Sequence, residues 1–186
     1  MSLKHLYRKP GHLIRRLQQI AVALFMLETE RLDLTPIQYA SLAAIRDVPG
    51  LDATRLSTLV ALDRATLAQV LERLEAKRFI ARVGAKEDRR IKRLAITPKG
   101  RRVLRSVEPG VRRAQRRILA PLKARERAAF MRMLEHLVAL NNDYSRAPLR
   151  AMVPRARKRN QKRKAAGWVR RSGIGASRRP GGSSTG

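Results

Sequence analysis

The side chains best suited to chemistry in this sequence follow Leu62, and their types suit hydrogen bonding to bases and phosphates. A helix that begins at Asp63 would present a small, polar and basic outer face made of Arg64, Ala65, Thr66, Gln69 and Arg73. Gln69 can bond an adenine through two atoms at once, and Thr66 can touch a thymine methyl group or a phosphate. The two arginines suit phosphates, which position a protein without specifying a sequence. The alternative is that Gln69 and Thr66 are ordinary solvated helix residues.

A second basic group follows this helix, where the apolar periodicity changes from helical to alternating. Residues 79–84 and 90–97 predict two short strands around a charged tip at 85–89. The candidate DNA contacts here are Arg89, Arg90, Lys92 and Arg93. We call the helix that begins after Asp63, which would contact the bases, the reading helix. A reading helix followed at once by a basic hairpin indicates a winged helix-turn-helix, in which the hairpin reaches the neighbouring groove. The alternative for Arg90 is a surface ion pair with Asp88 or Glu87.

The elements that must position these residues have clear start signals. Asp63 suits the N-cap of the reading helix, whose apolar positions Leu67, Val70, Leu71 and Leu74 repeat at helical spacing. The preceding helix begins after Asp52 in the same way. Before it, Thr35, Pro36 and Gln38 form a capping-box signal for a helix over residues 36–47. The sequence therefore predicts three helices ahead of the hairpin.

Long helices are predicted on both sides of this unit. A wide apolar stripe runs from His12 to about Leu32, and a helix this wide-faced needs partners on more than one side. After the hairpin, Thr97 as a cap and Pro98 at the first position start a very basic helix, which should be kinked or interrupted near Pro109 before it reaches residue 119. A last helix should span about 124–144. We expect a mainly α fold with a small β-hairpin, divided into dimerisation helices (1–33 and 98–145) and a DNA-binding domain (34–97).

The composition indicates a polyanionic partner. The 186 residues hold 43 Lys and Arg against 14 Asp and Glu, a formal net charge of +29. Residues 146–186 contain 13 basic and no acidic residues, which predicts a disordered basic tail. The few aromatic residues, 4% of the chain, disfavour single-strand binding by base stacking.

Other function classes find little support. Cysteine is absent, and the three histidines lack a metal-ligand spacing, so we expect no metal or cofactor. There is no phosphate-cradling glycine loop, nucleophile motif or carboxylate pair in an apolar setting, which argues against an enzyme. No apolar run approaches the roughly 18 residues that span a bilayer, and no secretory signal is visible, so the expected location is the cytoplasm.

Two motifs and the element order together resemble the MarR family of bacterial transcription regulators over residues 10–144. The motifs are Leu34-Thr35-Pro36-Ile37-Gln38 and the hairpin end Asp88-x-Arg90-x-x-x-Leu94-x-Ile96-Thr97, with Gly100 downstream. The string over residues 10–16 is also similar to members that control aromatic-acid catabolism, including repressors of nicotinate degradation.

The resemblance implies a two-fold dimer on a pseudo-palindromic operator. By the same resemblance, Arg90 would enter the minor groove and Asp88 would orient it. This chain departs from the family at Arg78, where glycine is common between the reading helix and the hairpin. Because glycine eases a left-handed C-cap, either Arg78 adopts that conformation at a modest cost or the helix ends differently.

The resemblance further implies that a phenolic or carboxylate ligand releases the DNA. The candidate lining comes from the first two helices: His12, Arg15, Arg16, Gln19, Gln38 and Tyr39. An arginine fork matches a carboxylate, and Tyr39 offers an aromatic face with a hydroxyl. Alternatively, Arg15 and Arg16 are solvated and His12 simply lies near a helix start. The alternative to a ligand-responsive repressor is a nucleoid-associated or RNA-binding protein that acts by charge.

Overall fold

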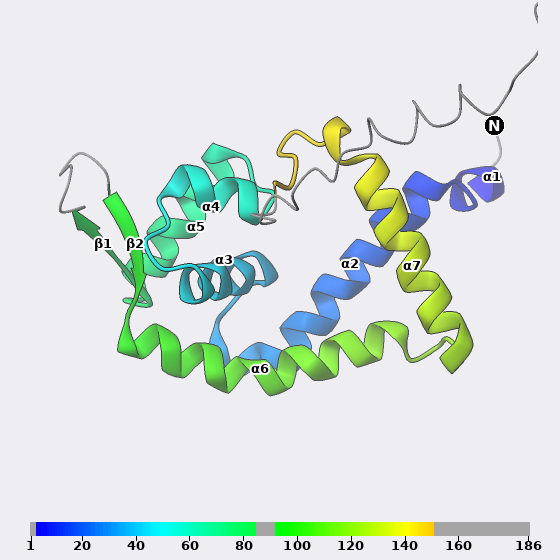
Figure 1. The fold of residues 1–186 in the computed structure, drawn as a ribbon. Helices are drawn as coiled ribbons and strands as arrows, with labels where there is room; N and C mark the ends of the chain where they lie inside the picture. Colours follow the sequence, from blue (N-terminus) through cyan, green and yellow to red (C-terminus); the bar gives the residue numbers. More distant parts are fainter. Residues whose placement is uncertain (1–2, 85–91, 151–186) are drawn as a thin grey trace, which may run out of the picture. The chain divides into compact units, whose positions relative to one another are not determined.

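The computed structural model describes residues 3–84 and 92–150, and the fold in this part is mainly helical (Figure 1). In chain order the elements are α1 (Leu3–Tyr7), α2 (Pro10–Thr29), a 3-10 turn (Glu30–Leu32), α3 (Pro36–Asp47), α4 (Ala53–Leu59), α5 (Arg64–Ala76), β1 (Ile80–Gly84), β2 (Lys92–Ile96), α6 (Pro98–Leu119), α7 (Ala124–Leu140) and a 3-10 turn (Asn142–Tyr144). The predicted fold class, a winged helix-turn-helix between long helices, is confirmed. In the described residues no helix is both long and apolar enough to cross a membrane.

The predicted helix starts are formed by the residues that signalled them. The Thr35 hydroxyl accepts from the Gln38 amide at 3.2 Å, and the Gln38 side chain accepts from the Thr35 amide at 3.3 Å. Asp52 caps α4 by accepting from the Arg55 amide at 2.8 Å. Thr97 caps α6 by accepting from the Gly100 amide at 3.0 Å. Each cap satisfies an amide that the first helical turn leaves unpaired, so the boundaries follow from local sequence.

The core lies between α3, α4, α5, the hairpin and α6, and Phe25 of α2 also belongs to it. All four apolar positions predicted for the inner face of α5 are buried, namely Leu67, Val70, Leu71 and Leu74. The strands pair antiparallel, with Ile80 opposite Ile96 and Gly84 opposite Lys92. The amide of Leu94 also donates to the carbonyl of Leu51 at 2.7 Å, which attaches β2 to the segment ahead of α4. The helix-turn-helix and the hairpin are therefore one packed unit.

One of the two alternatives expected for α6, an interruption near Pro109, was wrong. This helix is continuous from Pro98 to Leu119, although Pro109 lies inside it. Pro109 and Arg105 are both on the exposed side, so water can donate to the Arg105 carbonyl that proline leaves without a partner. The next residue, Gly110, is buried against α2. Packing on one side and solvent on the other thus allow the helix to continue through the proline.

Smaller differences concern the ends of elements. α2 gives way to the 3-10 turn after Thr29, three residues before the expected end. α1 forms in what was expected to be only a short basic lead. β1 begins at Ile80 rather than at residue 79, and α7 ends at Leu140. These shifts leave the predicted order of elements intact.

The crossing of α2 and α6 depends on close contact at one glycine. A β-carbon built on Gly110 would lie against the backbone carbonyl oxygen of Glu28, well inside van der Waals distance, and 3.1 Å from the Thr29 methyl carbon. The hydroxyl of Thr29 is turned back to donate to the Phe25 carbonyl at 2.8 Å. Because Gly110 has no side chain, the backbone of α6 lies directly against the backbone of α2 at this point.

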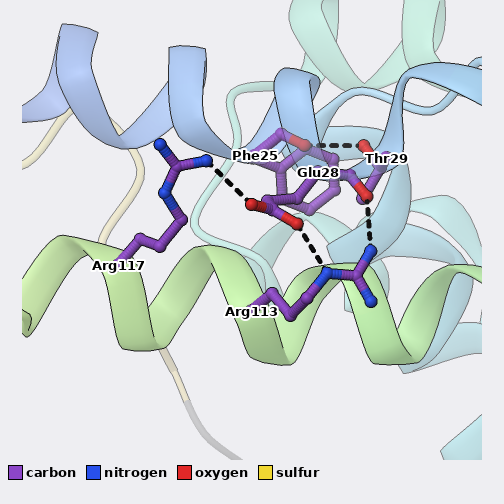
Figure 2. A network of polar contacts seen from close by, with 5 residues as sticks. All are labelled: Phe25, Glu28, Thr29, Arg113 and Arg117. Atoms are coloured by element: carbon purple, nitrogen blue, oxygen red, sulfur yellow. Dashed lines mark hydrogen bonds and ion pairs between the residues drawn. The ribbon is translucent and has the colours of Figure 1, made fainter.

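An ion-pair network closes the same crossing (Figure 2). The Glu28 carboxylate lies 2.6 Å from Arg113 Nε and 2.8 Å from Arg117 Nη1, and its side chain is only 14% exposed. The bonds from Arg117 and then from Arg113 hold the pKa of Glu28 below its usual range. A lowered pKa means that this contribution is present near neutral pH and is lost as the pH falls through the lowered value.

Gly110→Ala should destabilise the protein, because neither the Glu28 carbonyl nor the α6 backbone can move aside cheaply. We expect a loss of about 1–3 kcal/mol in the free energy of unfolding, measured by chemical denaturation at fixed protein concentration. The control is Gly11→Ala in α2, where a β-carbon would meet nothing within 4 Å. That change should be neutral or stabilising by up to about 1 kcal/mol. Equal stabilities of the two variants would contradict the close crossing.

Candidate nucleic-acid interface

The predicted reading face lies on the outer side of α5. Arg64, Ala65, Gln69 and Arg73 are all exposed there, opposite the four buried apolar residues of the same helix. Their common position follows from the 3.6-residue helical period, which separates an inner from an outer face. Ala68 and Glu72 are exposed on the same helix, so its solvent side carries small side chains, one amide, one carboxylate and two guanidinium groups.

Thr66 differs from the rest of this face because its hydroxyl already has a partner. The Asp63 carboxylate accepts from the Thr66 amide at 2.9 Å and from the Thr66 hydroxyl at 2.7 Å. These two bonds hold the pKa of the Asp63 carboxyl below its usual range. Thr66 is half-buried as a result. With its proton committed to Asp63, the hydroxyl is left to accept a hydrogen bond, and the methyl group is left for apolar contact.

The hairpin places two of its four candidate residues on the described surface. Lys92 and Arg93 are exposed on β2. Arg89 and Arg90, with the proposed orienting residue Asp88, lie outside the described residues. Arg82 on β1 forms an ion pair with Glu75 on α5 at 3.0 Å, which ties the hairpin to the reading helix.

The junction between α5 and the hairpin is made at Arg78, in the left-handed conformation that was one of the two expectations. Its φ is +60°. The amide of Phe79 donates to the Leu74 carbonyl at 2.9 Å, and the Arg78 amide donates to the Glu75 carbonyl at 2.7 Å, which is a Schellman C-cap. The Arg78 carbonyl then accepts from the Thr97 hydroxyl at 2.7 Å. Thr97, just after β2, is thus bonded to Arg78, just before β1, and this bond closes the base of the hairpin.

The six candidate ligand residues fall into two groups. His12, Arg15, Arg16 and Gln19 lie on the first half of α2, where the His12 ring faces Tyr7 at 5.4 Å and Arg16 donates to Gln19 at 3.3 Å. Gln38 and Tyr39 lie on α3. The Tyr39 ring is 5.9 Å from Phe25, and His12 precedes Phe25 by 13 residues, about 20 Å of helix. One chain therefore does not bring His12 to Tyr39.

The α3 pair has internal partners. Gln38 is buried and engaged in its capping box. The Tyr39 hydroxyl donates to the Glu108 carboxylate on α6 at 3.0 Å. Burial, and after it this hydrogen bond, raises the pKa of the Tyr39 hydroxyl above its usual value. Tyr39 thus contacts both α2 and α6 from α3.

Two features of this part of the chain were not predicted. Glu28 is the single acidic residue in the α2 sequence, and Arg113 and Arg117 lie one helical turn apart. The sequence showed these opposite charges, but it did not show that they form ion pairs with one another. A cavity of about 420 Å³ beside this network is lined by Leu27, Glu28, Thr29, Glu30, Leu32, Ser106, Pro109, Gly110 and Arg113. It includes none of the six candidate ligand residues.

Comparison with known proteins agrees with this architecture. The family model for the MarR family matches residues 32–91. The chain is 30% identical over 128 residues to the HTH-type transcriptional repressor NicR of Pseudomonas putida, covering 69% of this chain and 81% of the relative.

Solved structures of similar regulators match a comparable share of the chain. PcaV from Streptomyces coelicolor, in complex with its natural ligand, is 35% identical with a TM-score of 0.64, covering 72% of this chain and 94% of PcaV. BpsR from Bordetella bronchiseptica, a structure concerned with regulation of DNA binding by 6-hydroxynicotinic acid, is 30% identical with a TM-score of 0.66, covering 70% and 94%. The chain belongs to the MarR family, and the resemblance found in its sequence motifs is confirmed.

Two substitutions at Arg78 should separate the cost of its backbone conformation from the loss of its charge. Arg78→Gly and Arg78→Ala remove the same charge, but only glycine adopts a positive φ freely. We expect Arg78→Gly to be the more stable of the two by about 1 kcal/mol in denaturant unfolding. An alanine variant at least as stable as the glycine variant would argue against the left-handed cap.

Proposed function

We propose that the protein is a ligand-responsive repressor that binds a specific sequence of double-stranded DNA. The observation that carries the proposal is the exposed face of α5, a helix packed on its other side and followed at once by a basic hairpin. Gln69 reads a base edge, and Ala65 and Thr66 allow close approach to the groove. Arg64 and Arg73 contact phosphates on either side.

The hairpin extends this contact in our proposal. Arg89, Lys92 and Arg93 contact phosphates, and Arg90 reaches the adjacent minor groove. The proposed role of the tip comes from family membership, since residues 85–91 lie outside the described residues. The hairpin supplies reach along the DNA, while the reading helix supplies most of the sequence preference.

The proposed binding unit is a homodimer formed by α2 and α7. In the single chain α7 has no buried residue, and its Met133, Leu137 and Leu140 are 60%, 54% and 68% exposed. On α2, Leu13 and Ile14 are 54% and 60% exposed. Several exposed apolar side chains on each of two helices indicate an interaction surface. A two-fold dimer would set two reading helices about 34 Å apart, matching a pseudo-palindromic operator.

This arrangement supports the proposed division of the chain. Residues 1–33 and 98–145 supply the dimer helices, residues 34–97 read the DNA, and residues 146–186 form the basic tail. A charge-only nucleic-acid binder is the alternative, and the net charge of +29 would suffice for it. The two functions differ in discrimination between DNA sequences. Catalysis is not part of the proposal, because the relatives are transcription regulators.

The proposed effector is a small aromatic carboxylate or phenol. Support comes from NicR, a repressor, and from BpsR, whose DNA binding is regulated by 6-hydroxynicotinic acid. The proposed lining is His12, Arg15, Arg16 and Gln19 with Gln38 and Tyr39, and since one chain keeps these groups apart, a second subunit would complete the pocket. The ligand releases DNA by favouring a dimer geometry that no longer matches the half-site spacing.

Sequence discrimination tests the proposed function. A preferred duplex can be selected from a random pool, and its affinity compared with that of a scrambled duplex by fluorescence anisotropy at fixed salt. We expect a preference of about 10³-fold or more. Gln69→Ala should weaken the preferred duplex by about 5- to 150-fold, the equivalent of 1–3 kcal/mol, and leave the scrambled one unchanged. Gln115→Ala, on the exposed side of α6, is the matched control.

Equal affinity of the wild-type chain for both duplexes would contradict the repressor and favour the charge-only alternative. An undiminished preference in Gln69→Ala would leave the repressor intact but remove Gln69 from base reading.

Effector binding should raise the melting temperature and release the preferred duplex. We expect 6-hydroxynicotinate or a related aromatic acid, at about 100 times its dissociation constant, to add about 2.7 kcal/mol of apparent stability. The double variant Arg15→Gln/Arg16→Gln should lose this shift because the carboxylate loses its cationic partners. Arg112→Gln/Arg116→Gln, on the exposed side of α6, carries the same charge change and should keep the shift. A full shift in the first variant would show that the ligand binds elsewhere.

A further inference from the structure

The chain that follows α7 turns back onto the helix-turn-helix. The side chain of Asn142 holds this turn: its Oδ1 accepts from the Leu149 amide at 2.8 Å, and its Nδ2 donates to the Leu149 carbonyl at 3.3 Å. One residue further, the Arg150 amide donates to the carbonyl of Thr58 on α4 at 3.0 Å. We call residues 145–150 the return segment. The last two residues of this segment are therefore held by the 3-10 turn that follows α7 and by α4.

The return segment lies beside the start of the reading helix. A cavity of about 270 Å³ is lined by Ser57, Thr58, Leu62, Asp63, Arg64, Arg146, Ala147, Pro148 and Arg150. Ala147 and Pro148 are half-buried, whereas Arg146 and Arg150 are exposed. The segment thus packs Ala147 and Pro148 partly against the protein, while Leu149 and the two arginines are exposed, the arginines around the same cavity as Arg64.

Three arginines line this cavity against one carboxylate, an excess of two positive charges. Among the described residues, Arg64, Arg146 and Arg150 make no ion pair. The acidic group of the same lining is Asp63, whose carboxylate accepts two hydrogen bonds from the neutral amide and hydroxyl of Thr66 and keeps its negative charge. Three like charges held around one small cavity repel one another, and this repulsion is relieved when a polyanion binds.

We propose that Arg146 and Arg150 on the return segment form, together with Arg64, an additional contact with the DNA backbone beside each half-site. The inference rests on the proposed function, because the ligand is the same duplex that α5 reads. Continuity with the reading face identifies the partner: Arg64 belongs to both groups. Phosphate contacts of this kind add affinity and fix register, and they add no sequence information. The return segment therefore lengthens the DNA footprint without changing the base sequence that is preferred.

The charge test uses the full chain. Arg146→Gln/Arg150→Gln should weaken the selected and the scrambled duplex by the same factor, about 10-fold, and should lower the slope of log affinity against log salt by about one for each phosphate that the variant no longer neutralises. Arg112→Gln/Arg116→Gln removes the same charge from α6, whose exposed side is separated from α4 and α5 by α3 (Figure 1). This control should bind within about 2-fold of wild type with an unchanged slope.

A second variant changes position without changing charge. Asn142→Ala removes both side-chain bonds to Leu149 and keeps every arginine. We expect it to lose affinity for both duplexes, by less than the double arginine variant, while the melting temperature shows that the fold is intact. Wild-type affinity in Asn142→Ala would mean that the placement of the return segment is irrelevant to DNA binding.

The failure of this inference is distinguishable from failure of the proposed function. If the wild-type chain binds selected and scrambled duplexes equally, the proposed function fails. If the wild-type chain discriminates between them but the double arginine variant binds like its α6 control, the repressor stands and the return-segment contact is overturned.

Discussion

The close crossing of α2 and α6 is the constraint on which the other relations in the described chain depend. Gly110 lets the two backbones approach, and Glu28 then binds Arg113 and Arg117 across the contact. Because the N-cap of α6 is Thr97, whose hydroxyl donates to the carbonyl of Arg78, the direction of α6 also fixes the base of the hairpin. A change in the crossing would therefore be transmitted to the hairpin through a continuous helix. Local repacking could not absorb it, since protein interiors are close-packed.

The reading helix is held by a different kind of interaction. Its inner face is packed, its start is capped by Asp63, and its end is a Schellman cap closed at Arg78. These contacts are local. Among the outer-face side chains predicted to contact DNA, it is the Thr66 hydroxyl that takes part in them. The exposed residues proposed to contact bases can therefore be exchanged at little cost to stability.

Much of the fold could be predicted because its signals are local. The Thr35, Asp52, Asp63 and Thr97 caps and the helical repeat of α5 act within a few residues, so the sequence contained them. The continuity of α6 through Pro109 could not be predicted, because it depends on packing against α2, far away in the chain. The pairing of Glu28 with Arg113 joins residues 85 positions apart, and the bond from Arg150 to Thr58 is similarly non-local. No periodicity encodes contacts of this kind.

The candidate site residues could likewise be predicted only where local spacing decides their positions. The residues of α5 could be assigned to one surface because helical spacing alone brings them together. The proposed ligand residues could not be assembled from one chain, since His12 and Tyr39 lie on separate helices and about 20 Å of α2 separates the first from the neighbours of the second. Sequence reasoning supplied the residue types there, but the distances depend on how helices cross and on which chain contributes each helix.

The bond between Tyr39 and Glu108 has a consequence for the energetics of any ligand that uses this hydroxyl. Such a ligand must first replace Glu108 as the partner of Tyr39, and the freed carboxylate on α6 must find water or another donor. The measured affinity would then be the difference between two hydrogen-bonded states, smaller than the contacts with the ligand alone suggest. The same exchange would remove the hydrogen bond between α3 and α6. Part of the binding free energy would then be spent on changing the contact between these two helices.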